Sequence, residues 1–335
     1  MATLNDLVTF DISQLFNGAV DVDWLTNDNA KAVKAAQSFV FHGPTYHAVA
    51  QEEVAGTGHK LVDTATFAWK TVSGLTTGHS NNPFVLAIAG FGSGKSHLAV
   101  TLAGLLSSTD ELQTKILQNI AQADGDIAVS LKTALLHIGK ILVVTLNGMN
   151  NGDLSSALLA AVKRRIEADN LDASPLYNLK GRFRDAANSV KMVDPVLISP
   201  LFEATGLASK EEVIAKLEDY DESAYKQVRD FLRTIGLSLR AFGDETAKDI
   251  LNTVAQEYIG EGKPYSRMLV LFDEFGHYME FATSHPQIAG DGALQQLFEG
   301  VQSNEDTVTF IGFIQYELKT PTRSEERRVG KECRS

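Results

Sequence analysis

The chain has 335 residues, of which 44% are hydrophobic and 21% charged, as in a typical water-soluble globular protein. This length allows one α/β domain with large insertions, or two domains. No apolar run is long enough to cross a membrane and the N-terminus lacks a secretory signal, so we expect a cytoplasmic protein without membrane contact. The formal net charge of −12 offers no general attraction to nucleic acid.

The first part of the chain is predicted to lead into an α/β core. Residues 1–58 form an N-terminal region rich in Asp, Asn, Thr and Gly, and residues 59–169 form the first part of the core. Apolar spacing predicts a helix over 59–75. The continuous apolar run 84–89 is typical of a parallel strand buried on both faces, and a Gly-rich turn and a helix follow it.

The core continues with helices and a second strand. Residues 109–139 are predicted to be helical, with a break at 124–126. Residues 140–146 form the second buried strand. Asp153 is placed to cap the next helix, because its carboxylate can accept hydrogen bonds from the first free backbone N–H groups.

The rest of the chain completes the predicted fold. Residues 170–262 alternate helical stretches with Pro and Gly breaks, which indicates an all-helical insertion. The second part of the core, 263–322, holds a third strand at 267–272, a helix at 293–301 and a fourth strand at 308–314. Strands that alternate with helices imply right-handed crossovers and a parallel sheet. The predicted fold class is therefore α/β, a three-layer sandwich with a helical insertion.

The end of the chain, 323–335, differs abruptly from the rest in composition. It resembles the translation of a sequencing-library adapter, whose reading frame begins Arg-Ser-Glu-Glu-Arg; a charged disordered tail is the alternative. The only cysteine, Cys333, lies there, so we expect no disulfide or thiolate–metal chemistry in the remainder.

Residues 89–96, Ala-Gly-Phe-Gly-Ser-Gly-Lys-Ser, match the Walker A phosphate-binding loop, except that Ala89 replaces the first glycine. Glycines let the backbone curl so that successive N–H groups point at a phosphate, and the next helix offers its positive end to the same anion. Lys95 would reach the β- and γ-phosphates, and Ser96 would bind Mg²⁺. A plain Gly-rich turn is the alternative, but the position between a buried strand and a helix favours binding of ATP and Mg²⁺. The predicted cofactor-binding residues are Ala89, Gly90, Phe91, Gly92, Ser93, Gly94, Lys95, Ser96 and His97.

Two adjacent acids, Asp273 and Glu274, follow an apolar strand, which is the Walker B arrangement. Asp273 would hold the Mg²⁺ shell and Glu274 would activate the attacking water. Because neighbouring side chains of a strand point apart, the two carboxylates can serve the metal and the water separately. The alternative is a helix N-cap followed by an acid in the first turn. With the loop, these acids predict an ATPase.

Polar residues at other strand ends are further candidates. Gln315 ends the fourth strand, where related ATPases place a residue that senses the γ-phosphate; a surface glutamine is the alternative. Thr145 and Asn147 end the second strand, where α/β sheets bind ligands, and either can position water. Asn147 followed by Gly148 is equally consistent with a plain turn.

The basic and imidazole side chains carry weaker signals. His97 follows the loop directly and is more typical of a packing residue than of a catalyst. The histidines show no spacing of metal ligands. The cluster 163–165, Lys-Arg-Arg, is most simply the solvated face of a helix, with a strip for DNA or a partner as the alternative.

Two segments resemble a known family. They are 92–98, Gly-Ser-Gly-Lys-Ser-His-Leu, and 273–280, Asp-Glu-Phe-Gly-His-Tyr-Met-Glu. They are similar to AAA+-like P-loop ATPases of bacterial phage-defence clusters, including the BREX-type ATPases, over roughly 59–165 and 265–318. The Walker motifs occur in many families, so the specific part is the Ser-His-Leu and Phe-Gly flanks. The resemblance implies a homo-oligomer or a multi-protein defence complex that acts on DNA.

The resemblance also implies a strand order of 5-1-4-3-2, with Walker B on the third strand and the sensor on the fourth. Since four strands are predicted here, we expect an N-terminal fragment whose fifth strand, lid and arginine finger lie beyond this sequence. A nucleotide-dependent signalling or scaffold switch with little turnover is the main alternative to an ATPase, and a small-molecule kinase is a third. Glu274 favours hydrolysis, because a switch that only binds nucleotide does not need the second acid.

Overall fold

The computed structural model describes residues 19–45, 61–77, 82–90, 92–107, 110–179, 181–195, 197–237, 239, 246–290 and 292–315. The predictions made for Phe91 and for the tail at 323–335 concern residues outside these ranges.

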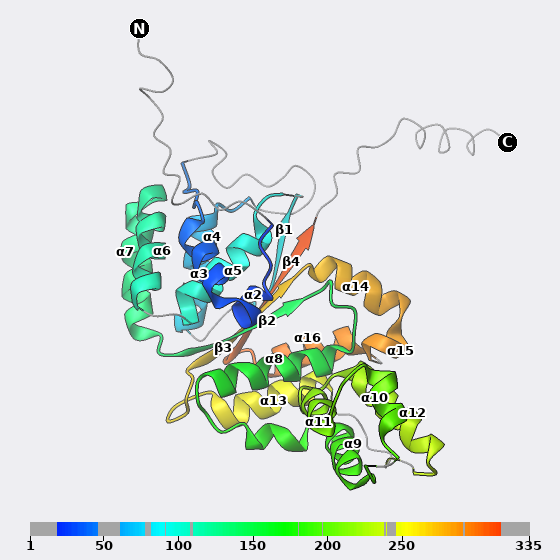
Figure 1. Ribbon diagram of the computed structural model, residues 1–335. Helices are drawn as coiled ribbons and strands as arrows, with labels where there is room; N and C mark the ends of the chain where they lie inside the picture. Colours follow the sequence, from blue (N-terminus) through cyan, green and yellow to red (C-terminus); the bar gives the residue numbers. More distant parts are fainter. Residues whose placement is uncertain are drawn as a thin grey trace, which may run out of the picture.

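Four parallel strands form one sheet at the centre of the molecule (Figure 1). They are β1 (Phe84–Ala89), β2 (Ile141–Asn147), β3 (Arg267–Asp273) and β4 (Val308–Gln315), in the spatial order β1-β4-β3-β2. Each strand begins and ends within one residue of its predicted position, and the parallel pairing is confirmed. The order agrees with the 1-4-3-2 part of the order that the resemblance implies.

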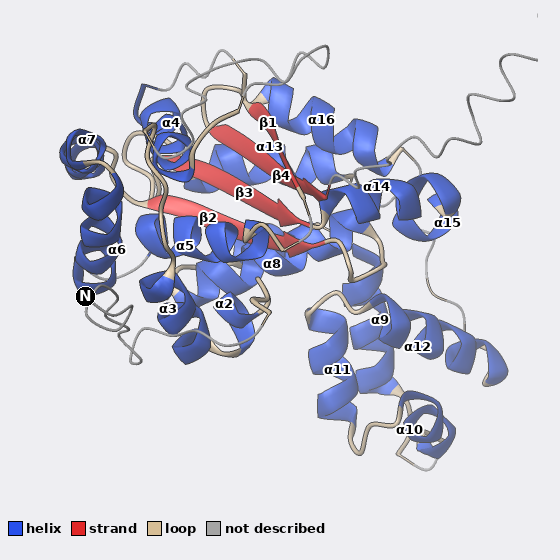
Figure 2. Ribbon diagram, turned by 90° about the horizontal axis from the view of Figure 1, so that it is seen from above, coloured by secondary structure: helices blue, strands red, loops and turns tan. Residues whose placement is uncertain are grey.

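Helices cover both faces of the sheet, as an α/β sandwich requires (Figures 1 and 2). Successive residues of a strand point to opposite faces, so Val143 and Leu269 belong to one core cluster, whereas Leu142 and Val270 belong to the other. The helices of the first face are α3 (Asn29–Ser38), α4 (Thr64–Thr77), α5 (Lys95–Ser107), α6 (Asp110–Ala123) and α7 (Gly125–His137). Those of the second face are α8 (Leu154–Ala168), α13 (Ala247–Tyr258), α14 (Phe275–Ser284) and α16 (Ala293–Ser303).

A group of helices forms a lobe beside the second face (Figure 2). Its members are α9 (Gly181–Met192), α10 (Ser199–Thr205), α11 (Lys210–Glu218) and α12 (Glu222–Thr234), preceded by the 3₁₀ helix η2 (Ser174–Asn178). Helix α13, which the sequence placed in the same insertion, packs against α8 and α16. The short helix α15 (Pro286–Ala289) follows α14.

Local signals explain several helix ends. Asp153 caps α8 as predicted, because its Oδ1 accepts a hydrogen bond of 2.7 Å from the N–H of Ser156. The helix predicted at 59–75 is observed as α4, with Asp63 accepting from the N–H of Thr66 at 2.8 Å. Two helices that were not predicted, α2 (Trp24–Asn27) and α3, lie in the N-terminal region. Across the described ranges, no helix is both long and apolar enough to span a bilayer.

Candidate functional site

The loop between β1 and α5 adopts a conformation that only glycine enters readily. Gly92 and Gly94 have φ angles of +72° and +83°. Helix α5 starts directly after them, and the N–H of Leu98 donates to the carbonyl oxygen of Gly94 at 2.8 Å. The first free N–H groups of α5 and the helix dipole therefore face the carboxyl edge of the sheet, where an anion can bind.

Lys95 lies over this loop. Its Nζ donates to the carbonyl oxygens of Ala89 at 3.3 Å and Gly90 at 3.0 Å. The N–H of Ser93 donates to the same Gly90 oxygen at 3.4 Å, so the loop closes on itself. The ammonium group thus lies at the mouth of the loop without a carboxylate ion pair among the described residues.

Asp273 lies at the end of β3, beside the loop, and is only 4% exposed. A hydrogen bond links its carboxylate to Ser96, and Lys95 is close enough to act on it electrostatically. Burial raises the pKa of Asp273 above its usual value; the charge of Glu274 adds to the rise, while Ser96 and Lys95 oppose it. Among the residues that the structure describes, its buried Oδ1 has no hydrogen-bond partner, which is unusual for a buried polar atom.

Glu274 follows at a sharp turn between β3 and α14. Its φ and ψ of 50° and 36° are left-handed, a conformation that costs a non-glycine residue roughly 1–3 kcal/mol and is concentrated at functional sites. The side chain of Glu274 is half-buried, next to the buried Asp273. The alternative that Asp273 or Glu274 serves as an ordinary N-cap is not supported, because Glu274 occupies the N-cap position without a side-chain capping bond.

The turn at Glu274 is held by the end of the neighbouring strand. Asn147 pairs with Asp273 across β2 and β3, and the N–H of Gly148 donates to the carbonyl oxygen of Asp273 at 2.8 Å. A Cβ atom on Gly148 would lie 2.2 Å from the carbonyl oxygen of Glu274. Gly148 is therefore a close-approach position and not merely a flexible turn.

This close approach gives a stability prediction. We expect Gly148→Ala to lower the free energy of unfolding by about 2 kcal/mol or more, because the methyl group meets backbone atoms that must move together with the acids. Gly152→Ala is the matched control, since the atom nearest to its Cβ would be 3.9 Å away. Urea unfolding of the two variants measures the difference; equal midpoints would contradict the close approach.

Sequence reasoning missed the residues that hold Asn147. Its Nδ2 donates to Asp21 Oδ1 at 3.2 Å and Asp23 Oδ2 at 3.0 Å, and its Oδ1 accepts from the N–H of Met149 at 3.0 Å. Both polar atoms of the Asn147 amide are therefore used in hydrogen bonds, the nitrogen to the N-terminal region and the oxygen to its own turn. This arrangement does not support the prediction that Asn147 positions water. Asp21 and Asp23 carried no motif, and only the tertiary fold brings them to β2.

Gln315 lies on β4 and Thr145 on β2, with β3 between the two strands. Gln315 is paired with Ala89, so the tip of β4 adjoins the start of the phosphate loop, and its role as a sensor stays a prediction. Thr145 lies on the edge strand β2 and lines a cavity on its outer side, away from the loop.

His97 packs against the N-terminal region. One ring nitrogen, Nε2, lies 2.6 Å from the carbonyl oxygen of Ala35, and the ring meets that of Phe39 edge-on at 4.9 Å. Burial lowers the pKa of His97 below its usual value, which keeps the ring neutral at pH 7. These contacts support the packing interpretation and give no support to a ring contact with a cofactor.

The basic cluster on α8 is not a uniformly solvated face, contrary to the simplest interpretation of the sequence. Lys163 is 8% exposed, and its Nζ donates to the carbonyl oxygen of Glu218 at 2.8 Å. Arg165 pairs with Asp169 at 2.8 Å. Only Arg164 is exposed. The cluster mainly ties α8 to the helical lobe and to its own C-terminus.

Within the part of the chain that the structure describes, no group of three or more His, Cys, Asp or Glu side chains could hold a metal ion by itself. No protein-family model, no curated protein and no solved structure matches the chain. What the protein does must therefore be inferred from its own residues.

Proposed function

We propose that the protein binds ATP together with Mg²⁺ and hydrolyses the γ-phosphate bond. The observation that carries this proposal is the buried, unpartnered Oδ1 of Asp273 beside Ser96 and the cationic Lys95, at the mouth of a left-handed glycine loop. A buried carboxylate oxygen without a partner is costly unless a ligand satisfies it. A cation bound to a polyphosphate is the ligand that this combination suits.

The residues present fit Mg²⁺. This ion prefers oxygen ligands and is usually held by one or two carboxylates plus substrate phosphates, so a site without a three-ligand cage is expected. Ser96 and Asp273 would hold it, and the ion would neutralise charge on the phosphates. Lys95 and the backbone N–H groups of the loop would bind the phosphate oxygens.

Glu274 supports turnover over a nucleotide switch. A general base needs an accessible carboxylate, and Glu274 keeps a half-buried side chain at the left-handed turn directly after the buried Asp273. The backbone strain supports a functional role, because a residue selected only for stability would avoid it.

The wider assignment is also a proposal. We infer a P-loop NTPase fold of the AAA+ type from the strand order β1-β4-β3-β2, with the loop after β1 and the acids after β3. A role in a homo-oligomer or a defence complex acting on DNA rests on the resemblance of the loop and acid flanks alone. ATP turnover measured with and without duplex DNA tests the last part.

Asp273→Asn tests the fit of the metal. A raised pKa in the folded state means that the folded protein binds the proton more tightly, so the nucleotide-free protein loses stability as the pH rises above 3.8. An amide carries no such cost, and we expect the variant without nucleotide to be more stable at pH 7 by about 0.5–2 kcal/mol. The same variant should lose the extra stabilisation that Mg²⁺ adds to ATP.

Thermal unfolding of both proteins, alone, with ATP and EDTA, and with ATP and Mg²⁺, measures both effects. Glu305→Gln, which makes the same carboxylate-to-amide change at an exposed position, is the control. If Mg²⁺ stabilises Asp273→Asn as much as the unchanged protein, Asp273 is not its ligand.

A further inference from the structure

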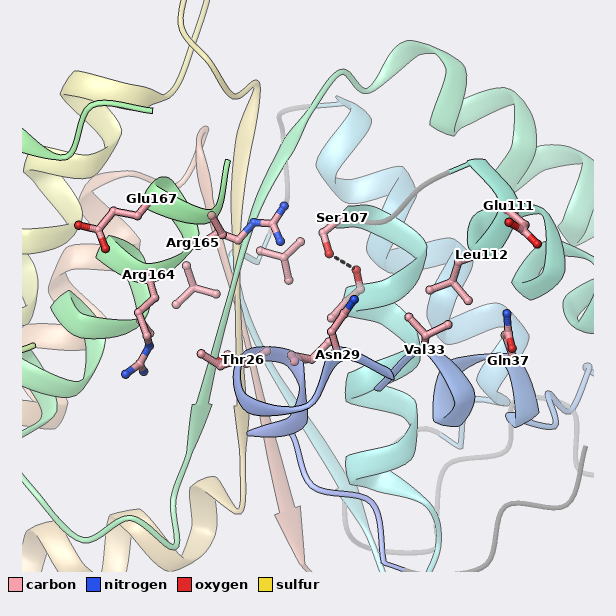
Figure 3. A pocket seen from close by; sticks show the side chains of 17 residues that line it. Thr26, Asn29, Val33, Gln37, Ser107, Glu111, Leu112, Arg164, Arg165 and Glu167 are labelled. Carbon is pink, nitrogen blue, oxygen red and sulfur yellow. Dashed lines mark hydrogen bonds between the residues drawn. The ribbon is translucent and has the colours of Figure 1, made fainter. Parts of the chain in front are cut away.

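The N-terminal segment, residues 19–39, contacts both halves of the candidate site. Near its start, the carboxylates of Asp21 and Asp23 accept hydrogen bonds from the turn that follows β2. Near its end, the carbonyl oxygen of Ala35 lies 2.6 Å from Nε2 of His97, in the first turn of α5. In between, its helices α2 and α3 line a cavity together with β2 and α5 (Figure 3). One segment therefore joins the sheet edge next to the acids to the helix that follows the phosphate loop.

The two aspartates hold the turn after β2 through asparagine side chains. Asn147 Nδ2 donates to Asp21 Oδ1 at 3.2 Å and to Asp23 Oδ2 at 3.0 Å. Asn150 Nδ2 donates to the same Asp23 oxygen at 3.2 Å. Val22, between the aspartates, is fully buried in the core of the first face, which fixes the segment relative to the sheet. Hydrogen bonds to ionised acceptors are stronger than those between neutral groups, so these contacts hold the turn firmly.

The same turn lies against the backbone of the two acids. The N–H of Gly148 donates to the carbonyl oxygen of Asp273 at 2.8 Å, and a Cβ atom on Gly148 would lie 2.2 Å from the carbonyl oxygen of Glu274. Farther along, the hydroxyl of the buried Tyr278 donates to the carbonyl oxygen of Gly152 at 2.8 Å. Tyr278 belongs to α14, the helix that starts directly after Glu274. Because such close packing transmits displacements, the position of the turn fixes the backbone that carries Glu274.

We propose that Asp21 and Asp23 are positioning residues for ATP hydrolysis, which hold the turn after β2 against Glu274. This inference rests on the proposed function. A general base must lie within hydrogen-bond reach of the water, and a misplacement of about 1 Å can cost roughly 100-fold in rate. The phosphate loop and Lys95 do not depend on this turn, so nucleotide binding is separate from it. The site therefore hydrolyses ATP only while the N-terminal segment is docked, which makes this segment a control element of the enzyme.

The double variant Asp21→Ala/Asp23→Ala, made in the full chain, tests the proposal. We expect kcat to fall by at least about tenfold, because the base is displaced, while KM and the affinity for ATP and Mg²⁺ stay unchanged. Phosphate release and nucleotide titration measure these quantities. Asp28→Ala is the matched control: it removes the hydrogen bond of 3.2 Å from the N–H of Lys31 at the start of α3, in the same segment but away from the turn. It should lower stability and leave kcat as it is.

A reversal of the hydrogen-bond direction separates positioning from a folding defect. Asn147→Asp turns the donor into an acceptor that faces two carboxylates, so it should lower kcat as the double alanine variant does. Adding Asp21→Asn and Asp23→Asn supplies amide donors to the carboxylate at position 147 and should restore most of kcat. A failure of this triple variant to recover turnover would contradict the role of these hydrogen bonds.

Hydrogen exchange of the Gly148 amide gives a readout that needs no nucleotide. Because this N–H donates to Asp273, it should exchange at least about tenfold faster in the double alanine variant than in the unchanged chain or in Asp28→Ala. Unchanged kcat in the double alanine variant, or equal losses of turnover and ATP affinity, would overturn the positioning role. If the unchanged chain binds ATP without hydrolysing it, the proposed function fails instead, and the exchange of Gly148 then decides whether the aspartates hold the turn.

Discussion

Replacing Lys95 with alanine is expected to weaken the binding of ATP and Mg²⁺ by about 100-fold. Lys95 is the cation at the mouth of the phosphate loop, and it already donates to Ala89 and Gly90 of that loop. A charge-assisted hydrogen bond contributes roughly 1.5–3 kcal/mol, and each 1.4 kcal/mol is a factor of ten in affinity. Calorimetric or fluorescent-nucleotide titration measures the loss directly.

The control must separate a lost phosphate contact from a damaged loop. Lys132→Ala removes an exposed lysine on α7, on the outer side of the first helical layer, and should bind ATP normally. Lys95→Arg keeps the charge with a different shape and should recover part of the affinity. Circular dichroism should show that Lys95→Ala folds, since the Leu98–Gly94 hydrogen bond that starts α5 does not involve the side chain. Unchanged ATP affinity in Lys95→Ala would rule out the phosphate-binding role.

The positions of the strands could be predicted because each strand is largely apolar. The prediction that β1 is buried on both faces is wrong, however, because β1 is an edge strand on which Leu86 and Ile88 are 45% and 40% exposed. Strands such as β3, buried on both faces, need no polar alternation, and their ends are marked by glycine or acids. The pairing of Asn147 with Asp273, which brings the carboxyl ends together, then follows from the parallel order. The phosphate loop and the two acids could also be predicted, because each of these motifs consists of residues that are adjacent in the sequence.

Features built by tertiary contacts could not be predicted in this way. The hydrogen bonds that Asn147 donates to Asp21 and Asp23 join residues more than a hundred positions apart, so no local sequence pattern indicates them. Lys163 was expected in solvent because charged helix residues usually are. Its burial is instead compensated by the hydrogen bond that its ammonium group donates to the carbonyl oxygen of Glu218 on the helical lobe. The close approach of Gly148 to Glu274 is visible only once β2 and β3 are side by side.

Replacing Glu274 with glutamine is expected to lower ATP turnover by about 10²–10⁴-fold while ATP still binds. Glutamine keeps the size and the left-handed backbone of Glu274 but cannot accept a proton from water. The phosphate loop and Asp273 remain intact, so affinity should change little. Phosphate release and nucleotide titration, measured on the same preparation, test both halves.

Glu280→Gln is the matched control, because Glu280 is an exposed carboxylate on the same helix α14 and should hydrolyse ATP at the unchanged rate. A second variant, Glu274→Gly, separates the base from the backbone strain: it should also stop turnover, but glycine accepts the left-handed conformation and the folded state should not lose stability there. Preserved turnover in Glu274→Gln would show that another group activates the water. Loss of both turnover and ATP affinity would instead place Glu274 in nucleotide binding. If the unchanged protein binds ATP and Mg²⁺ with no measurable turnover, the nucleotide switch is the better description of the site.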